Sequence, residues 1–181
     1  YLYNMCGIVI TPDREKIDSI KHRGIQFTSI EKNGWIYGHH RLPIQTLEED
    51  KWYQPIHLHD GFLLFNGEIF NCNEITGEEW ENDSQYLQDF FDTDEPIEKK
   101  LKEINKWDGF WSIVIVRKDK VIFFTDPLGK KQLYINRITG EVSSEVKGLS
   151  RTNQIDRNFI STVNKWGYNT DDRTLYEDVQ R

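Results

Sequence analysis

Several residue types are scarce in this chain of 181 residues, which has no alanine, one methionine and two cysteines. The two cysteines, Cys6 and Cys72, are too few for a disulfide framework, so the sequence predicts a reducing, cytoplasmic location. A membrane-spanning helix needs roughly 20 mainly apolar residues, and no run in the chain approaches that length. The N-terminal residues also lack the basic start and apolar stretch of a signal peptide. We therefore expect no membrane partner.

Positive charge is scarce as well, because 23 Lys and Arg stand against 30 Asp and Glu and give a net charge of −7. The basic residues are scattered, whereas a nucleic-acid surface needs a concentrated basic patch. Hydrophobic residues make up 37% of the chain and aromatic residues 13%. A chain of this size buries roughly 70% of its unfolded surface. The composition therefore predicts one packed domain, with or without a trailing segment, and no nucleic-acid partner.

Short β-branched and aromatic runs alternate with segments of helical period along the chain. Asn33-Gly34 is predicted to form a turn between two runs, and Asn66-Gly67 to end another, because Asn-Gly pairs favour turn conformations. The predicted strands cover residues 6–11, 25–30, 34–39, 61–65, 110–116, 120–125, 133–136 and 141–144. The predicted helices cover residues 13–21, 83–92, 96–106 and 156–166. Strands that flank a central pair of helices favour an α+β sandwich over alternating βαβ units.

The position of Cys6, directly after Met5, gives it a potential chemical role. Removal of an initiator methionine would make Cys6 the first residue, with its α-amine beside its thiol. That amine has an unperturbed pKa of about 7.7–8.0 and could take the thiol proton. The thiolate is the nucleophilic form, so the cysteine would be activated without a separate histidine. Taken alone, Cys6 is better explained as a small buried residue at the head of a strand.

Four further motifs follow Cys6 in a specific order. They are His22-Arg23-Gly24, residues 38–44, residues 65–71 and residues 126–129, the last with Leu-Tyr shortly behind it. In this order and spacing, the chain from residue 5 to about residue 149 resembles the class II glutamine amidotransferases, which are N-terminal-nucleophile hydrolases. The resemblance is strongest to the glutaminase domain of glutamine-dependent asparagine synthetase. It implies an αββα sandwich of two mainly antiparallel sheets with helices outside.

The resemblance implies catalytic roles for three residues. Cys6 would attack the side-chain amide carbon of glutamine, forming a γ-glutamyl thioester that releases ammonia and is then hydrolysed to glutamate. The side chain of Asn66 and the backbone N–H of Gly67 would hold the developing oxyanion. Loss of one oxyanion donor typically lowers the rate about 10²–10³-fold, so these donors are central to the expected chemistry.

The resemblance also implies a pocket for the amino-acid end of glutamine. Arg41 would pair with the α-carboxylate, since a forked guanidinium suits two oxygens. Asp83 would accept the α-amine, and Glu68 and the backbone at Ile44 would line the same pocket.

Each assignment has a structural alternative that the residues alone leave open. Arg41 can be an ordinary charge at a strand end, Asn66-Gly67 an ordinary turn, and the segment around Asp83 a helix N-cap, which is compatible with the binding role. Cys72 is interpreted as a bystander thiol. Four histidines suggest a metal cluster, but no Cys or carboxylate spacing completes a zinc pattern, so no metal site is predicted. These are His39, His40, His57 and His59.

The resemblance predicts three segments. Residues 1–5 are a leader or expression remnant with the initiator Met, and residues 6–150 are the glutamine amidotransferase domain. Residues 151–181 are a linker toward a missing synthetase domain. Residues 1–4 precede Met5 and would block the α-amine of Cys6. Three explanations stay open: an expression remnant, which we favour, a propeptide removed later, or a domain that no longer hydrolyses glutamine. The chain also departs from the family pattern at supporting positions. These are Ile25-Gln26 for Pro-Asp, Thr125 for Arg and Gln132 for Pro.

The expected function is glutamine hydrolysis that supplies ammonia to an asparagine synthetase-type amide-forming step. The expected partners are glutamine and a synthetase domain or subunit, with a homodimer left open. No cofactor is expected in this domain, because the chain has no Gly-rich phosphate-binding loop, and ATP and Mg²⁺ belong to the separate synthetase domain. Two alternatives remain, an inactive glutamine-binding or partner-docking module of the same fold and a relative that forms a different amide or lactam.

Overall fold

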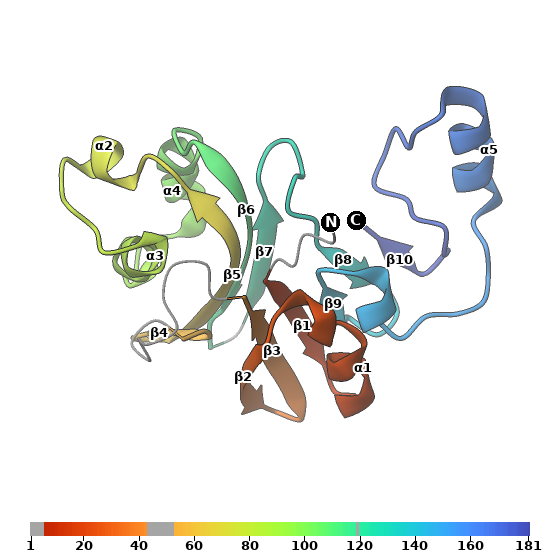
Figure 1. Cartoon of the computed structure of the whole chain (residues 1–181), viewed down its shortest axis with the longest axis horizontal. Helices are drawn as coiled ribbons and strands as arrows, with labels where there is room; N and C mark the ends of the chain where they lie inside the picture. Colours follow the sequence, from red (N-terminus) through yellow and green to blue (C-terminus); the bar gives the residue numbers. More distant parts are fainter. Residues whose placement is uncertain (1–5, 43–52, 119) are drawn as a thin grey trace. The chain divides into compact units, whose positions relative to one another are not determined.

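The computed structural model describes residues 6–42, 53–118 and 120–181. The chain divides into two compact units, Tyr1–Leu42 with Gln132–Arg181, and Pro43–Lys131, and each contains one antiparallel sheet (Figure 1). These units are defined by how compactly their residues pack, whereas the predicted boundaries at residues 5 and 150 separate a leader, a domain and a linker. The predicted boundaries stay a prediction.

The sheet of the first unit has six strands in the order β10-β8-β9-β1-β3-β2. The central strand β1 is buried along its whole length and pairs with β3, so that Gly7 lies opposite His40. Strands β2 and β3 form a hairpin whose turn residues, Asn33 and Gly34, have φ angles of 53° and 79°. Two successive positive φ values match the twist of a hairpin, which confirms the turn predicted from Asn-Gly. The strand bounds are β1 (Gly7–Thr11), β2 (Gln26–Lys32), β3 (Trp35–Arg41), β8 (Tyr134–Asn136), β9 (Val142–Ser143) and β10 (Val179–Gln180).

Helix α1 (Arg14–Ser19) packs on this sheet through its apolar side. Asp13 caps the helix by accepting a hydrogen bond from the Glu15 backbone N–H at 2.9 Å. Ile17 of α1 and the following residue, Ile20, pack with Val9 of β1 and Ile36 of β3. The remaining helical segments of this unit are η1 (Lys21–Arg23), η3 (Val146–Gly148) and α5 (Arg157–Trp166).

The sheet of the second unit has four strands in the order β4-β5-β6-β7. Figure 1 shows α2, α3 and α4 beside β5 and β6. Aromatic and aliphatic side chains from these helices and strands form one buried core cluster. The Trp107 indole N–H donates to the Tyr86 hydroxyl at 2.7 Å, so the polar tips of these two rings are satisfied inside the core. The bounds are β4 (Ile56–Leu58), β5 (Gly61–Ile69), α2 (Cys72–Thr76), α3 (Asp83–Phe91), α4 (Ile97–Ile104), β6 (Gly109–Val116) and β7 (Val121–Thr125).

One strand boundary differs from the prediction at two of the predicted site residues, Asn66 and Gly67. The strand predicted to end at Asn66-Gly67 continues to Ile69, because both residues pair with β6 rather than turning. A Cβ on Gly67 would lie 2.1 Å from the Phe110 carbonyl oxygen, so glycine here permits close strand packing instead of a turn. The short strands β4 and β10, the short helix α2 and the 3-10 segment η3 were not predicted.

The fold class is confirmed as α+β with two antiparallel sheets and few helices, which is compatible with the N-terminal-nucleophile hydrolase sandwich. Within residues 6–42, 53–118 and 120–181, every helix is too short or too polar to cross a bilayer.

Candidate functional site

Cys6 lies immediately before β1 and is half-buried. Its sulfur accepts a hydrogen bond from the Leu42 backbone N–H at 3.3 Å and lies 3.8 Å from the Leu42 carbonyl oxygen. Both cysteines of the chain are thiols. Because backbone contacts hold the sulfur beside Leu42, directly after β3, it has a defined position at one end of the inner strands β1 and β3.

The motif His22-Arg23-Gly24 packs around this cysteine. The Arg23 Nε donates a hydrogen bond to the Cys6 carbonyl oxygen at 3.0 Å. A Cβ on Gly24 would lie 2.4–2.6 Å from backbone atoms of Arg41, so only glycine fits there. Within this motif, Arg23 therefore holds the Cys6 backbone and Gly24 packs closely against the backbone of Arg41.

Arg41 is the last residue of β3 and lies at the same end of the sheet as Cys6, because Gly7 pairs with the preceding His40. Its Nη1 lies 3.5 Å from the side-chain oxygen of Gln26, the residue opposite it in β2. The structure thus brings together two of the predicted site residues, Cys6 and Arg41, in the first unit.

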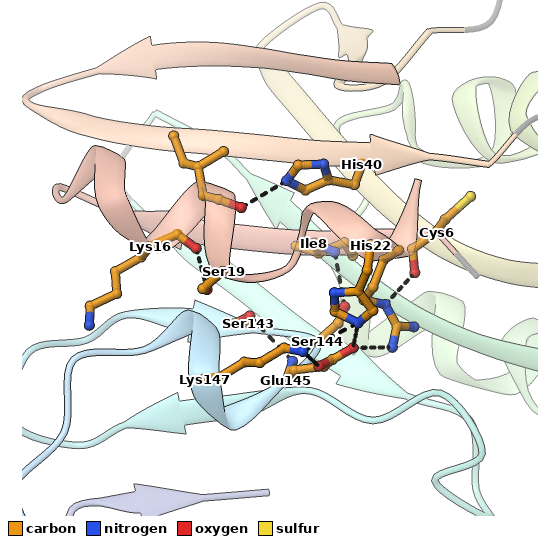
Figure 2. Close-up of polar contacts among 12 residues, drawn as sticks. Cys6, Ile8, Lys16, Ser19, His22, His40, Ser143, Ser144, Glu145 and Lys147 are labelled. Atoms are coloured by element: carbon orange, nitrogen blue, oxygen red, sulfur yellow. Dashed lines mark hydrogen bonds and ion pairs between the residues drawn. The ribbon is translucent and has the colours of Figure 1, made fainter. Parts of the chain in front are cut away.

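A carboxylate that the sequence analysis did not single out lies on the other side of Arg23. Glu145 Oε1 accepts hydrogen bonds from Arg23 at 3.0 Å and bonds His22 at 2.8 Å, while its Oε2 lies 3.1 Å from the Lys147 ammonium. Figure 2 shows the carbonyl oxygen of Cys6 directed toward this cluster and its sulfur directed away. Burial would raise the pKa of Glu145, but the hydrogen bonds from Arg23, Lys147 and His22 outweigh it and lower the pKa.

Asn66 and Gly67 belong to the second unit and lie in β5, opposite Ser112 and Trp111 of β6. Asn66 is only 2% exposed, and its Nδ2 has no hydrogen-bond partner among the residues that the structure describes. The Ser112 hydroxyl and the Trp111 indole N–H are likewise buried and have no hydrogen-bond partner among the described residues. Buried polar groups are nearly always bonded, so an amide in this state can donate to the oxygen of a ligand.

The predicted motif around Asp126 organises a loop next to these strands. Its carboxylate accepts hydrogen bonds from the backbone N–H groups of Leu128, Lys130 and Lys131 at 3.0–3.1 Å and of Trp111 at 3.3 Å. Burial would raise the pKa of Asp126, but these backbone donors lower it on balance. Asp126 thus ties the loop to the β6 residue that lies opposite Gly67.

Asp83 is the first residue of α3, and the preceding Asn82 caps that helix by accepting from the Gln85 backbone N–H at 3.0 Å. Asp83 is half-buried, and burial is the main reason that its pKa is raised to about 6. The negative charge of Glu68 also raises the pKa, while hydrogen bonds from backbone groups, chiefly Ile69, oppose the shift. The end of β5 and the start of α3 therefore place two acidic residues, Glu68 and Asp83, close together.

Ile44 lies outside the described residues. Cys6 and Arg41 lie in the first unit and the other described site residues in the second, so each group is characterised by itself. In the described part of the chain, no three His, Cys, Asp or Glu residues are grouped as metal ligands. Burial is the main cause that raises the pKa of Cys72 to about 11, so its thiol is poorly reactive.

Comparison with known proteins identifies the family to which this chain belongs. The profile of the glutamine amidotransferase domain matches residues 5–181. The chain therefore belongs to the glutamine amidotransferase domain family, as its motifs predicted. Asparagine synthetase [glutamine-hydrolyzing] 1 of Saccharomyces cerevisiae is 30% identical to it over 146 residues. The match covers 72% of this chain and 24% of the yeast protein, so the chain spans about a quarter of the length of that relative.

Proposed function

We propose that the chain hydrolyses glutamine to glutamate and ammonia, with Cys6 as nucleophile. The observation that carries the proposal is the buried Asn66 amide, whose donors have no acceptor in the described part of the chain. An amide in this state suits a negatively charged oxygen that exists only during the reaction. Family membership and the position of the Cys6 thiol beside Leu42 support the same reading.

The proposed reaction begins when the α-amine of Cys6 takes the proton of its thiol. The thiolate forms a bond to the side-chain amide carbon of glutamine, and the carbonyl electron pair moves onto oxygen, to which Asn66 Nδ2–H and Gly67 N–H would donate. The tetrahedral species collapses, its C–N bond breaks, and ammonia leaves with the proton from the α-amine. Water then adds to the thioester carbon and displaces the thiol, which yields glutamate and restores Cys6.

The proposed binding residues match the charges of a free amino acid. The guanidinium of Arg41 would pair with the α-carboxylate and the carboxylate of Asp83 with the α-ammonium, with Glu68 beside it and the backbone at Ile44 in the same pocket. An arriving ammonium favours the ionised form of Asp83, so glutamine binding would reverse the upward shift of its pKa. Two such charge pairs would favour a zwitterionic substrate over a simple amide.

The reaction requires Cys6 to be the first residue of the working chain, because only then is its nitrogen an amine. The ammonia would pass to a synthetase domain or subunit of the asparagine synthetase type, where ATP and Mg²⁺ would act. The relation to the yeast synthetase supports this coupling.

The test compares glutamate release by three forms of the protein: the chain from Tyr1, the chain matured to begin at Cys6, and the matured chain carrying Cys6→Ala. Intact mass establishes each N-terminus. We expect turnover only from the matured chain with cysteine. Equal rates from the matured chain and its Cys6→Ala variant would refute the proposal, and calorimetric glutamine binding without turnover would point to an inactive binding module instead.

A further inference from the structure

The Glu145 carboxylate joins three basic side chains from two distant parts of the sequence. Arg23 and His22 come from η1, more than 120 residues before Glu145, and Lys147 comes from η3. The Arg23 and Glu145 side chains are only 14% and 24% exposed. Partly buried, charge-assisted contacts of this kind hold side chains more firmly than surface ion pairs do.

Arg23 is held at both ends of its guanidinium. Its Nη1 donates to Glu145 Oε1 at 3.0 Å, and its Nε donates to the Cys6 carbonyl oxygen, also at 3.0 Å. Its side chain passes over Gly7, where an added Cβ would lie 2.8 Å from Arg23 Cδ. Glycine has little conformational preference of its own, and the hydrogen bond from Arg23 adds a side-chain contact that orients the carbonyl of the Cys6–Gly7 peptide.

Besides the contact through Arg23, hydrogen bonds between Ser144 and Ile8 fix the segment that carries Glu145 to the start of β1. The Ser144 hydroxyl accepts from the Ile8 backbone N–H, and the Ser144 N–H donates to the Ile8 carbonyl, both at 2.9 Å. Figure 2 shows Ser144 and Glu145 beside Ile8 and His22. Glu145 therefore projects from backbone whose position relative to the cysteine is already set, which makes it an effective anchor for Arg23.

We propose that Glu145 is a positioning residue for the nucleophile: it orients Arg23, and through Arg23 it fixes the carbonyl of Cys6 and hence the direction of the thiol. This inference rests on the proposed function and adds to it a residue that never touches substrate. A misplacement of reacting groups by about 1 Å can cost on the order of 100-fold in rate. We therefore expect Glu145→Gln to lower kcat for glutamine hydrolysis about 10- to 100-fold and to change KM less than threefold.

The test measures kcat, KM and Tm of the matured chain and its Glu145→Gln variant. Glu31→Gln is the matched control, because Glu31 is an exposed carboxylate of the same unit that pairs with Arg14. Arg23→Met and the double variant complete a thermodynamic cycle, in which the loss from Glu145→Gln should nearly vanish once Arg23 is absent. Glu145→Asp, which keeps the charge but shortens its reach, should recover only part of kcat, and it replaces Glu145→Gln if that variant does not fold.

Several outcomes would overturn the inference. A kcat within twofold of the wild type would do so, as would a loss that a lower folded fraction fully accounts for, since that indicates a structural role alone. Equal losses in the presence and absence of Arg23 would exclude the proposed route. Wild-type turnover with an unaffected Glu145→Gln variant would leave the proposed function intact, whereas a wild type without turnover would defeat the function and this inference together.

Discussion

Asp83→Asn is expected to make the domain more stable at pH 8 and weaker in binding glutamine. Burial is the largest cause that raises the Asp83 pKa from 3.8 to about 6, so folding disfavours its charged form. The difference of about 2 pKa units corresponds to at most about 3 kcal/mol at a pH where the carboxylate is ionised. Loss of a negative charge from the first turn of α3 costs about 0.3–1 kcal/mol. We therefore expect a net gain of about 1–2 kcal/mol.

The sign of the pH dependence follows from the direction of the shift. Because the folded state binds the Asp83 proton more tightly than the unfolded state, the wild type loses this contribution as pH rises from about 4 through about 6. The advantage of Asp83→Asn should therefore be absent below pH 4 and complete above pH 7. Urea denaturation of both proteins at several pH values measures it, with Asp89→Asn, at an exposed position of the same helix, as the control.

Glutamine binding supplies the second half of this prediction. Truncating one partner of a desolvated charge pair typically costs 2–5 kcal/mol, so KM for glutamine should rise at least about tenfold. A gain in stability with a loss in binding is the pattern expected when a residue is kept for function. A variant that is no more stable than the wild type at pH 8, or whose KM is unchanged, would refute the reasoning.

Three further predictions concern single side chains. At pH 8, iodoacetamide should label Cys6 and spare Cys72, whose pKa is about 11, and peptide mapping that finds equal labelling of the folded protein would contradict this. Asn66→Ala should lower kcat about 10²–10³-fold with little loss of stability, since its buried Nδ2 has no partner among the described residues; an unchanged kcat would remove Asn66 from the oxyanion site. Glu141→Gln should destabilise the first unit by about 1–3 kcal/mol in urea denaturation, because this buried carboxylate accepts hydrogen bonds from the Thr11 and Thr139 hydroxyls and from the Ser150 backbone N–H. A change below about 0.5 kcal/mol, roughly the effect of an ordinary surface substitution, would count against that role.

Local sequence signals predicted much of the fold. The β2–β3 hairpin was predictable because Asn33-Gly34 adopts two positive φ angles that few other pairs accept. The helix from Asp83 was predictable because a capping residue precedes an apolar face. The end of β5 was not, because Gly67 serves strand packing against Phe110 and the sequence does not distinguish this use of glycine from a turn.

The candidate site was only partly predictable for a similar reason. The order and spacing of the motifs predict roles for Cys6 and Asn66, and these roles stay predictions. The hydrogen bonds around Arg23 could not be predicted in this way, because they depend on chain segments that lie far apart in the sequence. Glu145 contacts Arg23 across 122 residues, and nothing local to residue 145 indicates a carboxylate with three basic neighbours. Pairing of β9 with β1 brings that segment beside the cysteine, so the contact is a property of the sheet and not of any motif.

The central claim is that Cys6, as the first residue of the matured chain, forms a covalent bond to the glutamyl group. Acid quenching during turnover, followed by intact-protein mass spectrometry and peptide mapping, tests it most directly. We predict a γ-glutamyl adduct on the peptide that begins at Cys6, removable by hydroxylamine and absent from the Cys6→Ala variant. Glutamate release with the adduct on another residue, or with the same rate in Cys6→Ala, would contradict the account.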